Sequence, residues 1–69
     1  MERINKILKD NNFTLFHCYE VDDYLIIELI DNKKPKINKE QTEQFFRITR
    51  VLNDLDIKYK ISGYKKIKI

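Results

Sequence analysis

The chain has 69 residues, a formal net charge of +3 and one cysteine. This length fits one domain, residues 1–69, with a thin hydrophobic core, and a lone cysteine excludes an intramolecular disulfide. The polar start Met-Glu-Arg-Ile-Asn-Lys has no apolar run of the kind that forms a signal or membrane helix. These features predict a cytoplasmic protein of a reducing compartment that has no contact with a membrane.

The first part of the chain predicts a helix followed by a β-hairpin. Residues 2–10 carry an apolar stripe at helical spacing, which is typical of a short amphipathic helix. Residues 13–20 and 24–30 are rich in aromatic and β-branched residues, which favour strands. Asp22-Asp23 lies between these two runs and fits a tight turn.

The register of this hairpin has two solutions. A two-residue turn pairs Cys18 with Ile27 and His17 with Glu28, whereas a three-residue turn shifts the pairing by one residue. In either register both faces of the hairpin remain largely apolar, although a sheet with one face in water should alternate more cleanly. We therefore expect the second face to be covered, either by the N-terminal helix or by a partner protein or a second copy of the chain.

The second half of the chain predicts a loop, a helix and a closing strand pair. Pro35 excludes a central strand over residues 31–36. Asn38 is a suitable N-cap for a helix that runs to about Asp54, with apolar residues at helical spacing along one side. The element order is α-β-β-α-β-β, which predicts a small two-layer α+β domain with an antiparallel sheet packed against one or two helices.

The last thirteen residues, 57–69, alternate apolar residues with lysine at the period of a strand and break at Ser62-Gly63. A two-residue turn there would set Lys60 opposite Lys65, which is a contact between like charges. A three-residue turn instead pairs Tyr59 with Ile67 and keeps one apolar face intact, so we favour this register. It gathers four lysines on the other face: Lys58, Lys60, Lys66 and Lys68.

The lysine face, with Tyr64 near the turn, is the strongest electrostatic feature. It could contact phosphates while a tyrosine stacks on a base, which makes nucleic-acid binding one hypothesis. The commoner explanation is a solvated strand face whose lysines prevent edge-to-edge aggregation. The modest net charge and the three arginines also favour the second explanation.

Two further regions suggest a protein interface. Phe46 falls outside the apolar stripe of its helix, beside Arg47 and Arg50, as an aromatic anchor would. It could equally be a scattered apolar residue at the surface. The first hairpin offers acidic and aromatic residues around its turn, although an acidic turn is more often simply a polar turn. The residues assigned to this second region are Tyr19, Asp22, Asp23 and Tyr24.

The sequence supports no catalytic centre. His17 and Cys18 are adjacent, so their side chains point to opposite faces of a strand and cannot form a dyad. His17 and Glu28 could pair across the strands, but nothing nearby supplies a nucleophile. Gly63 is the only glycine, and no cluster of cysteine and histidine is available for zinc. We therefore expect no enzyme activity, no cofactor and no metal.

The leading hypothesis is a non-enzymatic protein-binding module that acts as an inhibitor, adaptor or regulator of another protein. The alternative is a nucleic-acid-binding protein that uses the lysine face, and a homodimer is compatible with either role. The chain lacks alanine and is rich in Lys, Ile and Asn, the residues of AT-rich codons, which indicates a low-GC bacterium or its phage. For a phage product, a host defence or replication enzyme would be a natural target.

Overall fold

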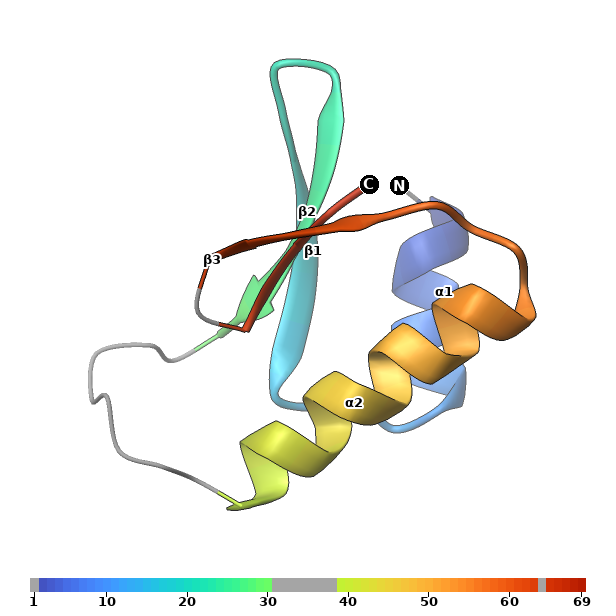
Figure 1. Cartoon of the computed structure of the whole chain (residues 1–69), viewed down its shortest axis with the longest axis vertical. Helices are drawn as coiled ribbons and strands as arrows, with labels where there is room; N and C mark the ends of the chain where they lie inside the picture. Colours follow the sequence, from blue (N-terminus) through green and yellow to red (C-terminus); the bar gives the residue numbers. More distant parts are fainter. Residues whose placement is uncertain (1, 31–38, 64) are drawn as a thin grey trace.

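The computed structural model describes residues 2–30, 39–63 and 65–69. Its four strands form one antiparallel sheet, and its two helices form a second layer (Figure 1). The predicted α+β fold and the predicted element order are confirmed. In chain order the elements are α1 (Glu2–Asp10), β1 (Phe16–Val21), β2 (Tyr24–Leu29), α2 (Lys39–Asp54), β3 (Lys60–Gly63) and β4 (Lys66–Lys68). The order of the strands across the sheet is β1-β2-β4-β3.

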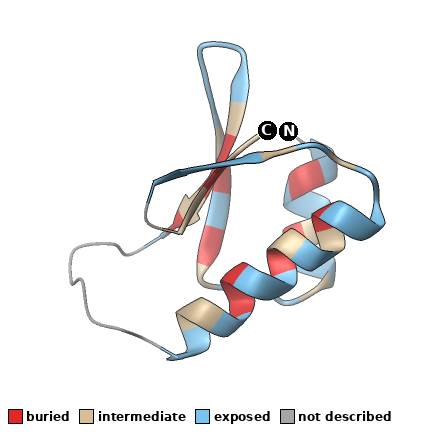
Figure 2. Cartoon of the chain, in the orientation of Figure 1, coloured by how far each residue is buried: buried red, intermediate tan, exposed pale blue. Residues whose placement is uncertain are grey.

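Both helices pack against the same face of the sheet. α1 contributes Ile4 and Leu8 to the core, and α2 turns its buried side towards the sheet (Figure 2). The expectation that the N-terminal helix covers the second face of the first hairpin is therefore wrong, because the stripe of α1 joins the same core as α2. The sheet contributes alternate residues to this core: Phe16, Cys18, Ile27, Leu29 and Ile67.

The two helices end in the same way. After α1, Asn12 takes a left-handed conformation (φ 58°) and the Phe13 N–H donates to the Leu8 carbonyl oxygen at 2.9 Å. After α2, Asp56 is left-handed (φ 57°) and Ile57 donates back into the helix. These are Schellman ends built on Asn and Asp in place of glycine. Because Phe13 closes α1 and is buried in the core, β1 begins at Phe16 and not at 13 as predicted.

The first hairpin has the two-residue turn. Cys18 pairs with Ile27 and His17 with Glu28, so the first of the two predicted registers is confirmed and the three-residue turn is excluded. Asp22 and Asp23 both have positive φ, 48° and 68°, which is the geometry of a type I′ turn. The backbone twist of this turn matches the twist of the flanking strands. The turn projects beyond the helices (Figure 1).

The closing hairpin has neither predicted register. Lys60 pairs with Lys68 and Ile61 with Ile67, which is offset by two residues from the register that we favoured. The cause is an irregularity between Ile61 and Gly63, where an extra residue bulges from β3 and Gly63 takes a φ of 155° that suits only glycine. An offset of two preserves the side on which each residue points, so the lysines still share one face.

α2 confirms the second predicted helix over most of its length. It ends at Asp54, as predicted, and Phe45, Ile48 and Leu52 are buried. The N-cap at Asn38 and the loop with Pro35 lie outside the described residues. α2 therefore contributes a single buried side to the core, and the other side of the helix faces solvent.

A buried glutamine attaches α2 to the segment that leads into β1. Gln44 is a buried polar residue, and its Oε1 accepts a hydrogen bond from the Leu15 N–H at 3.1 Å. The Leu15 carbonyl oxygen accepts from the Ile30 N–H at 3.0 Å, which extends the ladder of the first hairpin. Gln44 therefore satisfies a backbone donor that the sheet leaves unpaired and ties α2 to the start of β1.

We predict that Gln44→Met destabilises the protein by about 1–3 kcal/mol, because it leaves the Leu15 N–H without a strong acceptor while preserving side-chain length. For a chain of this size, each 1 kcal/mol lowers Tm by about 4–8 °C, which thermal unfolding followed by circular dichroism would detect. Glu43→Met is the matched control on the exposed side of α2 and should change stability by less than about 0.5 kcal/mol. Equal effects of the two substitutions would contradict a structural role for the glutamine hydrogen bond.

Candidate functional site: the outer sheet face and the edge groove

The sheet has one face that neither helix covers, and we call it the outer sheet face. The pairing of the strands places alternate residues on this face. Ile26 lies at its centre and is only 7% exposed, although it stands apart from the main core. The side chains around Ile26 are mostly polar or aromatic, with the exposed Val21 among them: His17, Tyr19, Val21, Tyr24, Glu28, Lys60, Lys66 and Lys68.

Glu28 organises one half of the outer sheet face. The Tyr19 hydroxyl donates to Glu28 Oε1 at 2.6 Å, and Lys66 Nζ lies 3.8 Å from Glu28 Oε2. The rings of His17 and Tyr19 lie 5.4 Å apart. The Glu28 carboxylate therefore fixes a tyrosine and a lysine, and His17 packs on that tyrosine. This arrangement does not favour the acid–base role considered for His17 and Glu28.

Tyr24 and Lys68 organise the other half. Lys68 Nζ lies 3.8 Å from the centre of the Tyr24 ring, which is a close cation–π contact. A shallow hollow of about 280 Å³ lies beside this pair. Three lysines and two tyrosines thus meet in one place, although they come from three separate segments of the chain. The hollow is lined by Tyr24, Lys58, Tyr59, Lys60, Lys68 and Ile69.

The structure regroups the two sets of residues proposed from the sequence. Of the lysine face, Lys58, Lys60 and Lys68 gather at the hollow, whereas Lys66 is next to Glu28. Tyr64, the predicted stacking residue, lies outside the described residues. Tyr24, which the sequence placed in a protein interface, is the tyrosine that lies among the lysines. Only the β2–β4 pairing brings it there, and no local pattern indicates that pairing.

The residues predicted to form a protein interface fall on two separate surfaces. Tyr19, Asp22, Asp23 and Tyr24 lie on the first hairpin, and the three α2 residues lie in the helical layer, on the other side of the sheet. Phe46 is 63% exposed and contacts the ring of Phe45 edge-on, with centroids 6.0 Å apart. Arg47 lies 5.8 Å from the centre of the Phe13 ring, and Arg50 is exposed.

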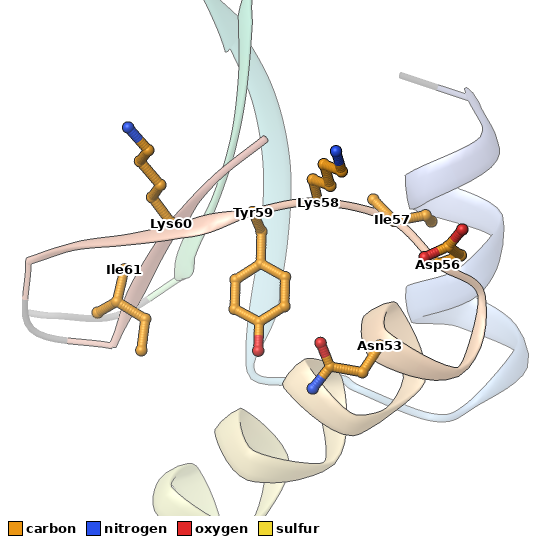
Figure 3. A pocket seen from close by; sticks show the side chains of 7 residues that line it. All are labelled: Asn53, Asp56, Ile57, Lys58, Tyr59, Lys60 and Ile61. Atoms are coloured by element: carbon orange, nitrogen blue, oxygen red, sulfur yellow. The ribbon is translucent and has the colours of Figure 1, made fainter.

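A larger hollow, which we call the edge groove, lies between β3 and the end of α2. Its volume is about 680 Å³, and its lining residues are Asn53, Asp56, Ile57, Lys58, Tyr59, Lys60 and Ile61. Tyr59 and Ile61 point towards α2, whereas Lys58 and Lys60 point away from it (Figure 3). Ile61 is 60% exposed, although its cross-strand partner Ile67 is fully buried. α2 therefore stops covering the sheet at β3. No local pattern in the sequence indicates this groove, and the exposure of Ile61 could be expected only with the correct register.

The remaining polar chemistry is modest. Cys18 is buried, and burial raises the pKa of its thiol, which makes it a packing residue with little thiolate. In the described part of the chain, no three His, Cys, Asp or Glu side chains gather in a way that could hold a metal ion. Over those same residues, no helix has both the length and the apolar character needed to cross a bilayer.

Comparison with models of known protein families, with curated protein sequences and with solved structures found no match to this chain. Its function is therefore inferred from its own residues. The outer sheet face and the edge groove each combine aromatic or apolar groups with more than one lysine. Both include Lys58, Tyr59 and Lys60, so a partner bound at either surface lies next to the other.

We predict that Tyr19 ionises at higher pH than an ordinary tyrosine. Its hydrogen bond to Glu28, with partial burial and the charge of that carboxylate, raises the pKa of Tyr19 above its usual value of 10.0. Because the pKa is raised in the folded state, this contact stabilises the fold below pH 10, and the stabilisation is lost as the pH rises through the folded-state pKa. Ultraviolet titration of the wild type minus Tyr19→Phe isolates the Tyr19 signal. Glu28→Gln should lower this pKa, and an unchanged midpoint would contradict the assignment.

Proposed function

We propose that the protein is a non-enzymatic binding module that holds another protein through its outer sheet face. The observation that carries this proposal is a pair of tyrosines fixed on a sheet face that no helix covers. The hydroxyl of Tyr19 is held by Glu28, and the ring of Tyr24, 48% exposed, is held by Lys68. Such side chains lose little rotamer entropy when a partner docks, which favours them as anchors.

The charges around these tyrosines indicate the partner's surface. Lys58, Lys60 and Lys68 surround the hollow beside Tyr24, so the complementary surface is acidic. Asp22 lies in the turn next to Tyr24, where a second hollow of about 240 Å³ includes Tyr19, Tyr24 and Lys66. A face with charges of both signs sets the orientation of a folded partner better than a uniform positive field would. By occupying that surface, the module would act as an inhibitor, adaptor or regulator.

The test is site-specific photocrosslinking with p-benzoylphenylalanine in an extract of the cells in which the protein acts. Placed at Tyr24, the probe should yield a protein adduct that resists nuclease and that disappears when unlabelled wild type is added in excess. The Lys60→Glu and Lys68→Glu changes, combined in the probe-bearing chain, should reduce the adduct at least fivefold, because they reverse the charge beside the probe.

The matched control places the same probe at Phe46, the exposed aromatic residue of α2. If the outer sheet face is the interface, we expect a strong adduct from position 24 and a weak one from position 46. An adduct from position 46 alone would move the interface to α2, where Arg47 and Arg50 also lie. No saturable adduct from position 24 would overturn the proposal for the outer sheet face.

Nucleic-acid binding is the second candidate, and the hollow beside Tyr24 favours it. Three lysines around the exposed ring of Tyr24 are the groups that a single strand needs, with phosphates on the ammonium groups and a base on the ring. The presence of Glu28 next to Lys66 and of Asp22 at the second hollow works against it, because both carboxylates repel phosphate. For this reason we rank it below protein binding.

For this candidate we predict a steep loss of affinity with salt. With three phosphate contacts, the affinity for a labelled single strand should fall roughly 20-fold between 50 and 200 mM salt. Fluorescence anisotropy would measure this fall, and replacement of Lys58, Lys60 and Lys68 by Gln should abolish binding. Lys6→Gln with Lys9→Gln, on the exposed side of α1, is the control and should have little effect. No binding at 50 mM salt would exclude this function.

A further inference from the structure

The edge groove joins a strand that has an unused side. Among the described strands, β3 lies at the edge of the sheet and pairs only with β4. No described segment of the chain pairs with its outer row of backbone N–H and C=O groups, and such a row can accept another extended segment. Lysines near such an edge discourage unspecific pairing, but they also select for a strand of opposite charge.

The edge groove provides a place for the side chains of an added strand. Ile61 is exposed on the side facing α2, and Ile57 and Tyr59 line the same groove. A segment paired to β3 would continue the sheet, so every second side chain would enter the groove. These side chains would cover Ile61 and Tyr59 and would therefore be apolar.

The alternate side chains of the added strand would emerge on the opposite side of the sheet. There they would meet Lys58 and Lys60, which point away from α2 (Figure 3). Acidic residues at these positions would form cross-strand pairs of opposite charge. The ligand that fits both sides is an extended segment in which apolar and acidic residues alternate.

A pair of β3 strands from two copies of this chain fits the same edge poorly. Pairing of β3 with β3 of another copy would place Lys60 among lysines of the partner strand, and like charges on one face of a strand pair are destabilising. A nucleic acid does not fit either, because it cannot supply a main-chain ladder. We propose that β3 is a strand-addition site for an extended, alternating apolar and acidic segment of a partner protein. This inference rests on the proposed protein-binding function and names the partner segment that binds next to the outer sheet face.

The test uses the whole protein and a fluorescein-labelled peptide, Glu-Val-Glu-Val-Glu-Val, with blocked ends. Anisotropy should show saturable binding, whereas the corresponding Lys-Val peptide should not bind. Methylation of alternate backbone nitrogens keeps the charge and the side chains of the Glu-Val peptide. It removes the N–H groups along one edge of the extended peptide, so that edge can no longer pair with a strand. If the ladder carries the binding, methylation on the pairing edge should weaken it at least tenfold. In hydrogen exchange, bound peptide should protect the outward amides of Lys60–Gly63.

Ile61→Glu should lower the affinity for the Glu-Val peptide at least tenfold, because it puts a charge in the apolar groove. Ile30→Glu is the matched control, since Ile30 is 61% exposed and lies outside the groove, and it should leave the affinity within twofold. Strand addition would be overturned if peptides methylated on either set of alternate backbone nitrogens bound equally well. It would also be overturned if Ile61→Glu had no effect on binding. If the peptide fails to bind while the Tyr24 adduct persists, only the inference for β3 falls, and loss of both overturns the proposed function as well.

Discussion

The burial of one set of apolar residues between α2 and the centre of the sheet determines the rest of this structure. Ile48 and Leu52 of α2 and Ile27 and Ile67 of β2 and β4 are the most deeply buried large side chains. β2 and β4 are adjacent in the sheet although they are far apart in the sequence, and this pairing closes the fold. In a chain of this size, the apolar residues suffice for one such layer. α1 joins the same core, so the opposite sheet face has no helix to cover it.

The outer sheet face is a consequence of this arrangement. Its centre, Ile26, is buried by tyrosines and lysines and not by a helix. The aliphatic stems of lysine can cover an apolar residue while the ammonium group remains in water. The cover that these side chains give to Ile26 explains how the first hairpin can be apolar on both faces. From the sequence, the second apolar face had suggested that a helix or a partner covers it. Much of that apolar surface is covered by neighbouring side chains of the sheet itself.

Local features could be predicted from the sequence, and non-local ones could not. The first hairpin and its turn could be predicted, and its register could be narrowed to two solutions one residue apart, of which the structure has the two-residue Asp22-Asp23 turn. For the closing hairpin the register could not be predicted, because alternating lysine and isoleucine look the same after any shift of two residues. Its register is set by the pairing of Ile67 with Ile27 on the neighbouring strand and by the bulge before Gly63. The lysine face could thus be predicted, but not the meeting of Tyr24 with Lys68, which depends on that same pairing.

β3 is the element at which the two candidate surfaces meet. Lys60 belongs to the outer sheet face and Ile61 to the edge groove, on opposite sides of one strand. Their difference in character follows from the position of α2, which covers Ile67 on the next strand but leaves Ile61 exposed. A partner that engaged only the outer face would leave Ile61 exposed, and one that engaged only the groove would leave Tyr24 unused. A protein with an acidic surface and an adjoining extended segment would satisfy both sides of β3, which no nucleic acid can do. The geometry of this edge therefore favours a protein partner more strongly than the lysines alone do.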